Sequence, residues 1–107
     1  MHEAGVAARA LEAALAAAPE VGRGAAPSAI RVTFDPRRVT EDSLRFHMEL
    51  ALGQAGLAGL PIQIEPSVVE CPACGARVPG EAWPLCESCG AVVPAGTGPM
   101  AEARFEA

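Results

Sequence analysis

The chain has 107 residues and 50% of them are apolar, which allows one small domain with a satellite module and excludes a large enzyme. It contains three Phe, one Trp and no Tyr, so we expect a thin core, and a bound metal would add stability that such a core does not supply. Thirteen acidic against eight basic residues give a formal net charge of -5, which repels a phosphate backbone, so we expect no nucleic-acid partner.

The longest apolar stretch, residues 4–19, contains two charged side chains, Arg9 and Glu12. A signal peptide has a basic start and an uncharged centre, and a bilayer-spanning helix needs about 18 or more apolar residues, so the stretch fits neither. We therefore expect a cytoplasmic protein that has no membrane partner.

Residues 4–18 are rich in strong helix formers, and the proline and glycines that follow end the pattern, so we expect a first helix there. Its apolar positions recur at spacings of three and four and should pack closely on a sheet; they are Ala4, Ala7 or Ala8, Leu11, Leu15 and Ala18. A loop over residues 22–28 leads to alternating residues over 29–34, which predict the first strand.

A second helix is expected from about Glu41 to Leu52. Thr40 is a good N-cap, and Glu41 and Asp42 lie in the first turn, where the helix dipole favours negative charge. The apolar positions that keep helical spacing are Leu44, Met48, Ala51 and Ala55.

The second strand is expected over residues 61–69, with Ile62 and Ile64 on one face. Two prolines in this segment place it near an edge of the sheet or break it in two. Alternation over residues 100–105 predicts a third strand. This order of elements indicates an α+β fold, a small three-stranded sheet with two helices, plus an inserted zinc-ribbon-like module before the last strand.

Two Cys-x-x-Cys-Gly motifs carry all four cysteines, Cys71 with Cys74 and Cys86 with Cys89, and eleven residues separate the pairs. The glycine of each motif permits a tight turn, and four thiolates with no open position match a structural zinc site. Iron in a rubredoxin-like arrangement uses similar spacing. Two disulfides are the remaining alternative, which the cytoplasmic expectation disfavours.

The amino terminus carries a second candidate metal site in Met1, His2 and Glu3. A terminal amine, adjacent backbone amides and an imidazole form small chelate rings that suit square-planar Ni(II) or Cu(II). A histidine at the second position is also common at solvated chain ends, so the pattern alone leaves both interpretations open. Binding would release protons from the ligands, so the affinity should fall as the pH drops.

The Met1-His2-Glu3 start and the two cysteine motifs, in a chain just over 100 residues long, together resemble the HypA/HybF family of hydrogenase-maturation nickel metallochaperones. Residues 30–34 are similar to the family's first strand, residues 43–50 to its second helix and residues 98–105 to its closing segment. The sequence departs from the family at residues 35–36, where Asp-Pro follows the first strand in place of the usual glycine.

The resemblance implies that His2, with the Met1 amine and the Glu3 backbone, binds nickel. It also places an acid of the second helix near the nickel, and Glu41 stands at that position, although the helix dipole would favour the same residue. Finally, it implies a structural Zn(II) ion bound by Cys71, Cys74, Cys86 and Cys89.

By the same resemblance, the protein is a nickel metallochaperone that delivers Ni(II) to a [NiFe] hydrogenase large-subunit precursor, or serves urease, and works with a nickel-handling maturation GTPase. Whether it forms a homodimer is left open. Residues 1–69 and 98–107 would form the nickel-binding α+β domain, and residues 70–97 the four-cysteine zinc module. The alternative is a zinc-ribbon protein-interaction module without nickel delivery. No catalytic triad or phosphate loop stands out, so we expect a carrier and not an enzyme.

Overall fold

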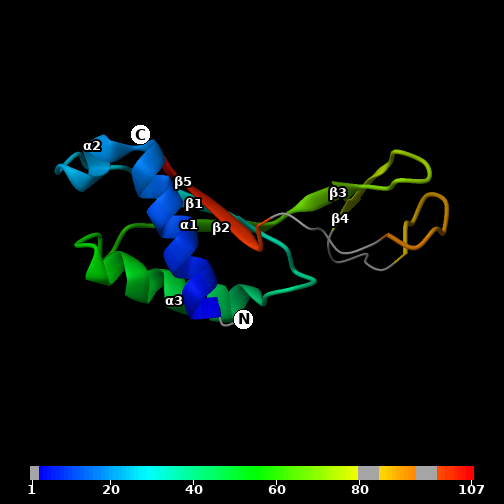
Figure 1. Cartoon of the computed structure of the whole chain (residues 1–107), viewed down its shortest axis with the longest axis horizontal. Coiled ribbons are helices and arrows are strands. Elements are labelled where there is room, and N and C mark those ends of the chain that lie inside the picture. The colour runs from blue at the N-terminus through cyan, green and yellow to red at the C-terminus, as the bar shows by residue number, and fades with distance from the viewer. Residues whose placement is uncertain (1–2, 80–84, 94–98) are drawn as a thin grey trace.

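The computed structural model of the chain describes residues 3–79, 85–93 and 99–107, and every structural statement below concerns these residues. Figure 1 shows the helices and the larger sheet at one end of an elongated molecule and a β-hairpin toward the other end. The elements are α1 (Glu3–Ala17), α2 (Pro19–Gly22), β1 (Ala29–Phe34), α3 (Glu41–Gln54), β2 (Ile62–Pro66), β3 (Val68–Glu70), β4 (Arg77–Pro79) and β5 (Ala101–Glu106).

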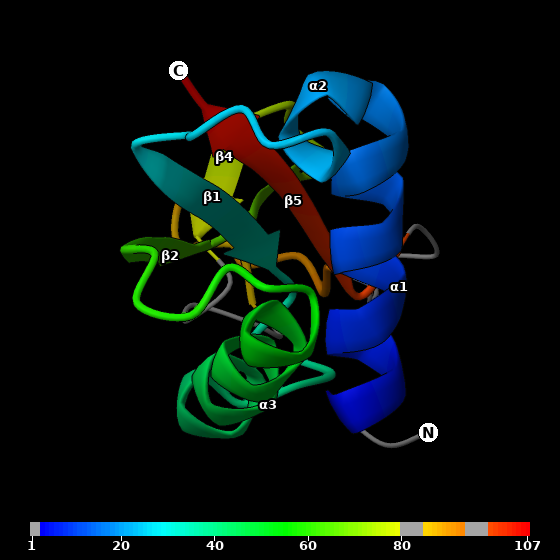
Figure 2. The ribbon, with the colours of Figure 1, turned by 90° about the vertical axis from the view of Figure 1, so that its left-hand side faces the viewer.

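The main sheet has three strands in the order β2-β1-β5. β1 is parallel to β2 and antiparallel to β5, and Val32 lies opposite both Ile64 and Ala103. Because β1 and β2 are parallel, the chain must cross over between them, and α3 makes that crossover. α1 and α3 pack against each other on the same side of the sheet (Figure 2). The α+β class and the three-stranded sheet predicted from the sequence are therefore confirmed; a single additional turn, α2, follows α1.

The core lies between the sheet and these two helices. Ile30, Val32 and Phe34 alternate along β1 and are all buried, whereas Arg31 and Thr33 between them lie toward the opposite face and are partly exposed. A fully buried aliphatic side chain contributes roughly 1.5–3 kcal/mol. The alternation expected for this strand thus decides which face of the sheet the helices cover.

The buried face of α1 differs in part from the expected stripe. Ala7 and Leu11 are buried as expected, but Ala4 and Ala8 are exposed. α1 contacts both α3 and β5, so its buried face is wider than one stripe and is turned from the predicted centre. Its buried residues are Val6, Ala7, Ala10, Leu11 and Ala14.

α3 begins at Glu41, as expected, and extends to Gln54, two residues beyond the predicted end. Thr40 is the N-cap residue by position, yet its hydroxyl makes no capping hydrogen bond. Near the other end of the helix, Leu52 is buried where the sequence predicted Ala55, and Ala55 is exposed. At the carboxyl end Gly56 has a positive φ of 79°, a conformation that favours glycine and closes the helix.

The strand expected over residues 61–69 lies at the sheet edge and is also broken in two. β2 ends at Pro66, the N–H of Ser67 donates to the Phe34 carbonyl (2.7 Å), and β3 then leaves the sheet to pair with β4. Proline cannot donate to a strand ladder, which explains the position of β2 at the edge. Within the described ranges, no helix is long and apolar enough to cross a membrane.

Candidate metal centre

The two cysteine motifs form two matching turns, residues 71–75 and 86–90, which we call the cysteine turns. In the first, the Gly75 N–H donates to the Cys71 carbonyl and the Cys71 N–H donates to the Ala76 carbonyl, both at 2.8 Å. In the second, the Gly90 N–H donates to the Cys86 carbonyl at 2.8 Å. The repeated sequence therefore folds into the same backbone geometry twice.

The glycine of each cysteine turn is required by backbone conformation and not by space. Gly75 has φ of 78° and Gly90 has φ of 76°, in the left-handed region that residues with a Cβ rarely adopt. A Cβ placed on either residue would meet no atom within 4 Å. The left-handed glycine closes the turn and brings both cysteines of its motif to one side.

The four sulfur atoms form one cluster. The Sγ atoms of Cys71 and Cys89 are 3.7 Å apart, as are those of Cys74 and Cys86, and all four lie within 4.8 Å of one another. A tetrahedral zinc site with Zn–S bonds of about 2.3 Å has its sulfur atoms about 3.8 Å apart. The cluster therefore has the dimensions of a four-thiolate metal site.

The cluster rests on a small apolar core of its own. Cys71 and Cys86, the first cysteine of each turn, are buried, and Val78 and Val93 pack against them. Among the residues that the structure describes, this core shares none with the main core between the sheet and helices. β3, β4 and the two cysteine turns, which we call the cysteine module, thus form a separate packing unit.

The sulfur atoms also shift one another's protonation. Backbone N–H groups of Cys89 and Ser88 lower the pKa of the Cys86 thiol to about 7. The Ala91 N–H lowers the pKa of the Cys89 thiol, but the crowded thiols and burial outweigh it and raise that pKa to about 12. Without a cation the cluster therefore retains protons, and a divalent metal supplies the positive charge that lets four thiolates coexist.

All four cysteines are free thiols, and their sulfur separations of 3.7 Å are far beyond the roughly 2.05 Å of a disulfide bond. This disagrees with the disulfide alternative. Iron and zinc both accept four thiolates in a tetrahedron, so the donor geometry alone fits either metal. No position of the tetrahedron is open, which fits a structural and not a catalytic metal.

The structure describes only some of the residues expected to bind nickel. Met1 and His2 lie outside the described residues, and Glu3 is the first residue of α1. Glu41 is the first residue of α3; its side chain is 49% exposed, and its carboxylate lies 3.8 Å from Arg45. Figures 1 and 2 both show the first turn of α1 beside α3, and Figure 1 shows it toward the end where α3 begins.

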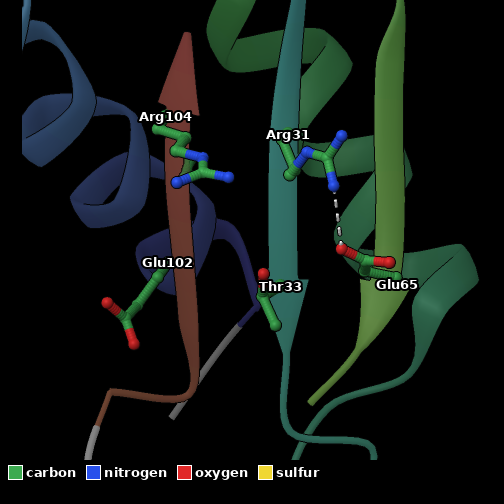
Figure 3. A pocket seen from close by; sticks show the side chains of 6 residues that line it. Arg31, Thr33, Glu65, Glu102 and Arg104 are labelled. Atoms are coloured by element: carbon green, nitrogen blue, oxygen red, sulfur yellow. Dashed lines mark hydrogen bonds and ion pairs between the residues drawn. The ribbon is translucent and has the colours of Figure 1, made fainter. Parts of the chain in front are cut away.

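The face of the sheet without helices carries a shallow cavity of about 360 Å³ that the sequence analysis did not single out. Figure 3 shows charged side chains of all three strands around it, with Arg31 at the centre. Arg31 lies 3.4 Å from a Glu65 carboxylate oxygen and 2.8 Å from one of Glu106, and these acids raise its pKa. In the sequence, this face is indicated by Arg31 and Thr33, which alternate with the buried residues of β1. Its ion pairs connect both outer strands to the central one.

The chain combines a small α+β domain with a separate module of four clustered cysteines. This combination is typical of metal-binding proteins with a structural metal centre. A model of the HypA family, described as hydrogenase/urease nickel incorporation metallochaperones, matches residues 1–98. The chain therefore belongs to the HypA family, as the resemblance of both ends indicated. A search of curated proteins found no match.

Proposed function

We propose that this protein is a nickel metallochaperone that binds Ni(II) at its amino terminus and delivers it to a [NiFe] hydrogenase precursor. The observation that supports this most strongly is the family match over residues 1–98, which spans both the Met1-His2-Glu3 start and the four cysteines. Because the matched family serves both hydrogenase and urease, urease is the second client to test.

In this proposal His2 binds nickel through its imidazole, together with the Met1 amine and the Glu3 backbone amide. These groups form small chelate rings in one plane, a geometry that Ni(II) accepts and Zn(II) does not prefer. Glu41 is the acid proposed to lie near the nickel. Its half-exposed carboxylate lies 3.8 Å from Arg45, and its exposure makes it accessible to a cation.

The second metal in the proposal is a structural zinc ion, held by Cys71, Cys74, Cys86 and Cys89. The size and closed form of the sulfur cluster support this assignment. We assign the nickel role to residues 1–69 and 98–107 and the zinc role to residues 70–97. Their two separate cores support such a division of roles.

The proposed activity is carriage and not catalysis. Nickel is the cargo, received and passed on, with a nickel-handling maturation GTPase and the hydrogenase large-subunit precursor as the proposed partners. A site at the chain end suits transfer, because a partner can reach its ligands one at a time. The cysteine cluster has no open position and is therefore proposed to stabilise the fold, not to hold cargo.

The test is a calorimetric nickel titration of zinc-loaded protein with an untagged amino terminus, kept under anaerobic conditions. His2→Ala is compared with His47→Ala, which removes the other histidine of the chain, a residue of α3 whose ring packs on Phe46 with centroids 5.2 Å apart. We expect micromolar or tighter binding that His2→Ala abolishes and His47→Ala retains, and that weakens near pH 6.

Nickel binding that is absent, or indifferent to His2, would contradict the proposal. The zinc-ribbon interaction module would then be the better account, since the sulfur cluster is sufficient for it. This alternative predicts that the protein binds one equivalent of zinc and has no selective nickel site.

A further inference from the structure

Helix α3 carries two large apolar side chains on the face that does not contact the sheet. Phe46 is 58% exposed and Leu50 is 51% exposed, and one helical turn separates them, so they are neighbours on the helix surface. The ring of His47 contacts the Phe46 ring edge-on, with the centroids 5.2 Å apart. We call Phe46, His47 and Leu50 the α3 patch. One of only three Phe residues in the chain therefore lies where it adds little to the core.

The α3 patch borders a shallow groove between the two long helices. The groove has a volume of about 250 Å³, and its lining includes Leu11 and Leu15 of α1 and Ala51 and Gln54 of α3. Ala51 lies one turn after the His47 of the patch, and Gln54 lies one turn after its Leu50, so the patch and the groove are continuous. Exposed apolar side chains beside a groove between two helices form a surface on which a third helix can pack.

Acidic side chains border the α3 patch on the side opposite the groove. Asp42 lies one turn before Phe46, and Glu49 lies three positions after it, so both are its neighbours on the helix surface. Both acids are exposed, and within the described residues neither makes an ion pair or a side-chain hydrogen bond. Arg45, the one arginine of α3, donates to a backbone carbonyl of β2 at 3.3 Å. The border of the patch is therefore negatively charged.

These features decide what kind of molecule the surface fits. Exposed apolar side chains in contact with one another indicate an apolar partner surface, and unpaired carboxylates favour Lys or Arg at its border. A second copy of the chain fits poorly, because in an antiparallel two-fold contact Asp42 of each copy would face Glu49 of the other. An anionic lipid surface would meet the same repulsion.

We propose that the α3 patch and the adjoining groove are a docking surface for a basic amphipathic helix of a partner protein. Apolar side chains of that helix pack against Phe46 and Leu50 and into the groove, and its Lys or Arg side chains face Asp42 and Glu49. Glu41, the first residue of α3, is about 7.5 Å from Phe46 along the helix axis. A docked partner is therefore close to the proposed nickel acid; this closeness rests on the proposed function, whereas the docking does not.

The test uses the zinc-loaded full chain without nickel, so its outcome does not depend on nickel binding. The probe is a synthetic helical peptide of Leu and Lys, with Leu at spacings of three and four, and a control peptide has Glu in place of every Lys. We expect the Leu–Lys peptide to shift the amide resonances around Phe46 and Leu50 and the Leu–Glu peptide to leave them unchanged. Equal shifts with both peptides, or shifts confined to other parts of the chain, would overturn the proposal.

Variants distinguish this surface from general attraction between a basic peptide and an acidic chain. Phe46→Ser, and separately Leu50→Ser, should weaken binding of the Leu–Lys peptide at least about tenfold, as expected for central apolar contacts. Val68→Ser changes a side chain of β3 that is 46% exposed outside the patch, and it should keep the parent affinity. Asp42→Asn combined with Glu49→Gln should weaken binding at least about threefold and reduce its salt dependence. Unchanged affinity in folded Phe46→Ser and Leu50→Ser proteins would contradict docking at the α3 patch.

A second copy of the chain is tested as the alternative occupant. Sedimentation of the zinc-loaded chain, with and without Phe46→Ser, measures self-association through this face, and we expect the same degree of association in both. Association that Phe46→Ser abolishes would assign the patch to a second copy and overturn the proposal. A chain that binds the Leu–Lys peptide as expected but binds no nickel would retain the docking surface and remove the proposed function.

Discussion

Cys71 and Cys89 are 18 positions apart in the sequence, and their sulfur atoms lie 3.7 Å apart. Cys74 and Cys86 are related in the same way across the two turns. Each short contact therefore joins a buried cysteine of one turn to an exposed cysteine of the other. The two turns depend on each other through their sulfur atoms, and removal of one ligand disturbs both.

Replacement of one exposed cysteine should therefore weaken the whole site. We expect Cys74→Ser to lower zinc affinity by more than about 100-fold, beyond the 10–100-fold typical for changes outside the ligand set. Competition with a chromogenic zinc chelator measures this. Ser88→Ala changes a residue of the second turn that is no ligand, and it should keep the parent affinity; equal affinity in both variants would contradict the four-thiolate assignment.

The identity of the structural metal can be read from the purified protein. We expect one equivalent of zinc by elemental analysis and a colourless solution, because zinc has no redox chemistry and a filled d shell. A red, redox-active preparation would indicate iron at the same cysteines and would favour an electron carrier.

Replacing the left-handed glycine of the second turn should change the stability in the opposite direction from replacing a glycine within a helix. Gly90→Ala forces a Cβ into φ of 76° and should destabilise the zinc-loaded module by about 1–2 kcal/mol. Gly53→Ala lies within α3, where nothing is within 4 Å of the added Cβ, and should stabilise the chain by about 0.5–1 kcal/mol. Zinc-loaded denaturant unfolding distinguishes them; the same sign for both would contradict the conformational explanation.

The buried Asp35 gives a prediction for pH. Burial raises the pKa of its carboxyl, but hydrogen bonds from Arg37 and Arg38 outweigh burial, so the pKa in the folded chain lies below the ordinary value. Its stabilisation is therefore fully present above the unfolded pKa of about 3.9 and is lost as the pH falls through the folded pKa. At pH 7, Asp35→Asn should lower the free energy of unfolding by about 3 kcal/mol, because it leaves the buried Arg37 charge without its carboxylate.

Urea unfolding of the zinc-free chain at pH 7 and at pH values below 4 measures this difference, which should shrink in acid. Asp42→Asn is the matched control, since Asp42 is exposed in the first turn of α3. It should cost no more than about 1 kcal/mol, the usual contribution of an acid at a helix amino end. An Asp35→Asn difference that stays constant down to low pH would contradict the assignment of the stabilisation to the charged carboxylate.

Local patterns in the sequence predicted the elements of the main domain well. Alternation located β1, and the prolines around Ile62 and Ile64 predicted that the second strand lies near an edge or is broken in two, of which the structure shows both. The spacing of the cysteines predicted their cluster. In each case the residues that carry the signal are neighbours in sequence or repeat at a fixed interval.

The features that were missed depend on contacts between distant segments. The face of α1 is set jointly by α3 and β5, so helical spacing alone placed Ala4 on it incorrectly and could not decide between Ala7 and Ala8, of which Ala7 is buried. The ion cluster around Asp35 was visible in sequence only as a departure from the expected glycine, because Arg38, one of its members, also donates to the Pro99 carbonyl, 61 positions away. The short strands β3 and β4, three residues each, carry too little alternation to be recognised.

The attachment of the cysteine module to the main sheet has a consequence for how much its length can vary. Phe34, at the end of β1, lies opposite both Pro66, where β2 ends, and Ala101, where β5 begins. The ends of the interrupted chain are thus only two strand spacings apart, roughly 10 Å, which a loop of a few residues spans. A metal-binding insertion at this place leaves every strand pair of the main sheet unchanged. The strand pairs of the main sheet therefore place no constraint on the length of the module between them.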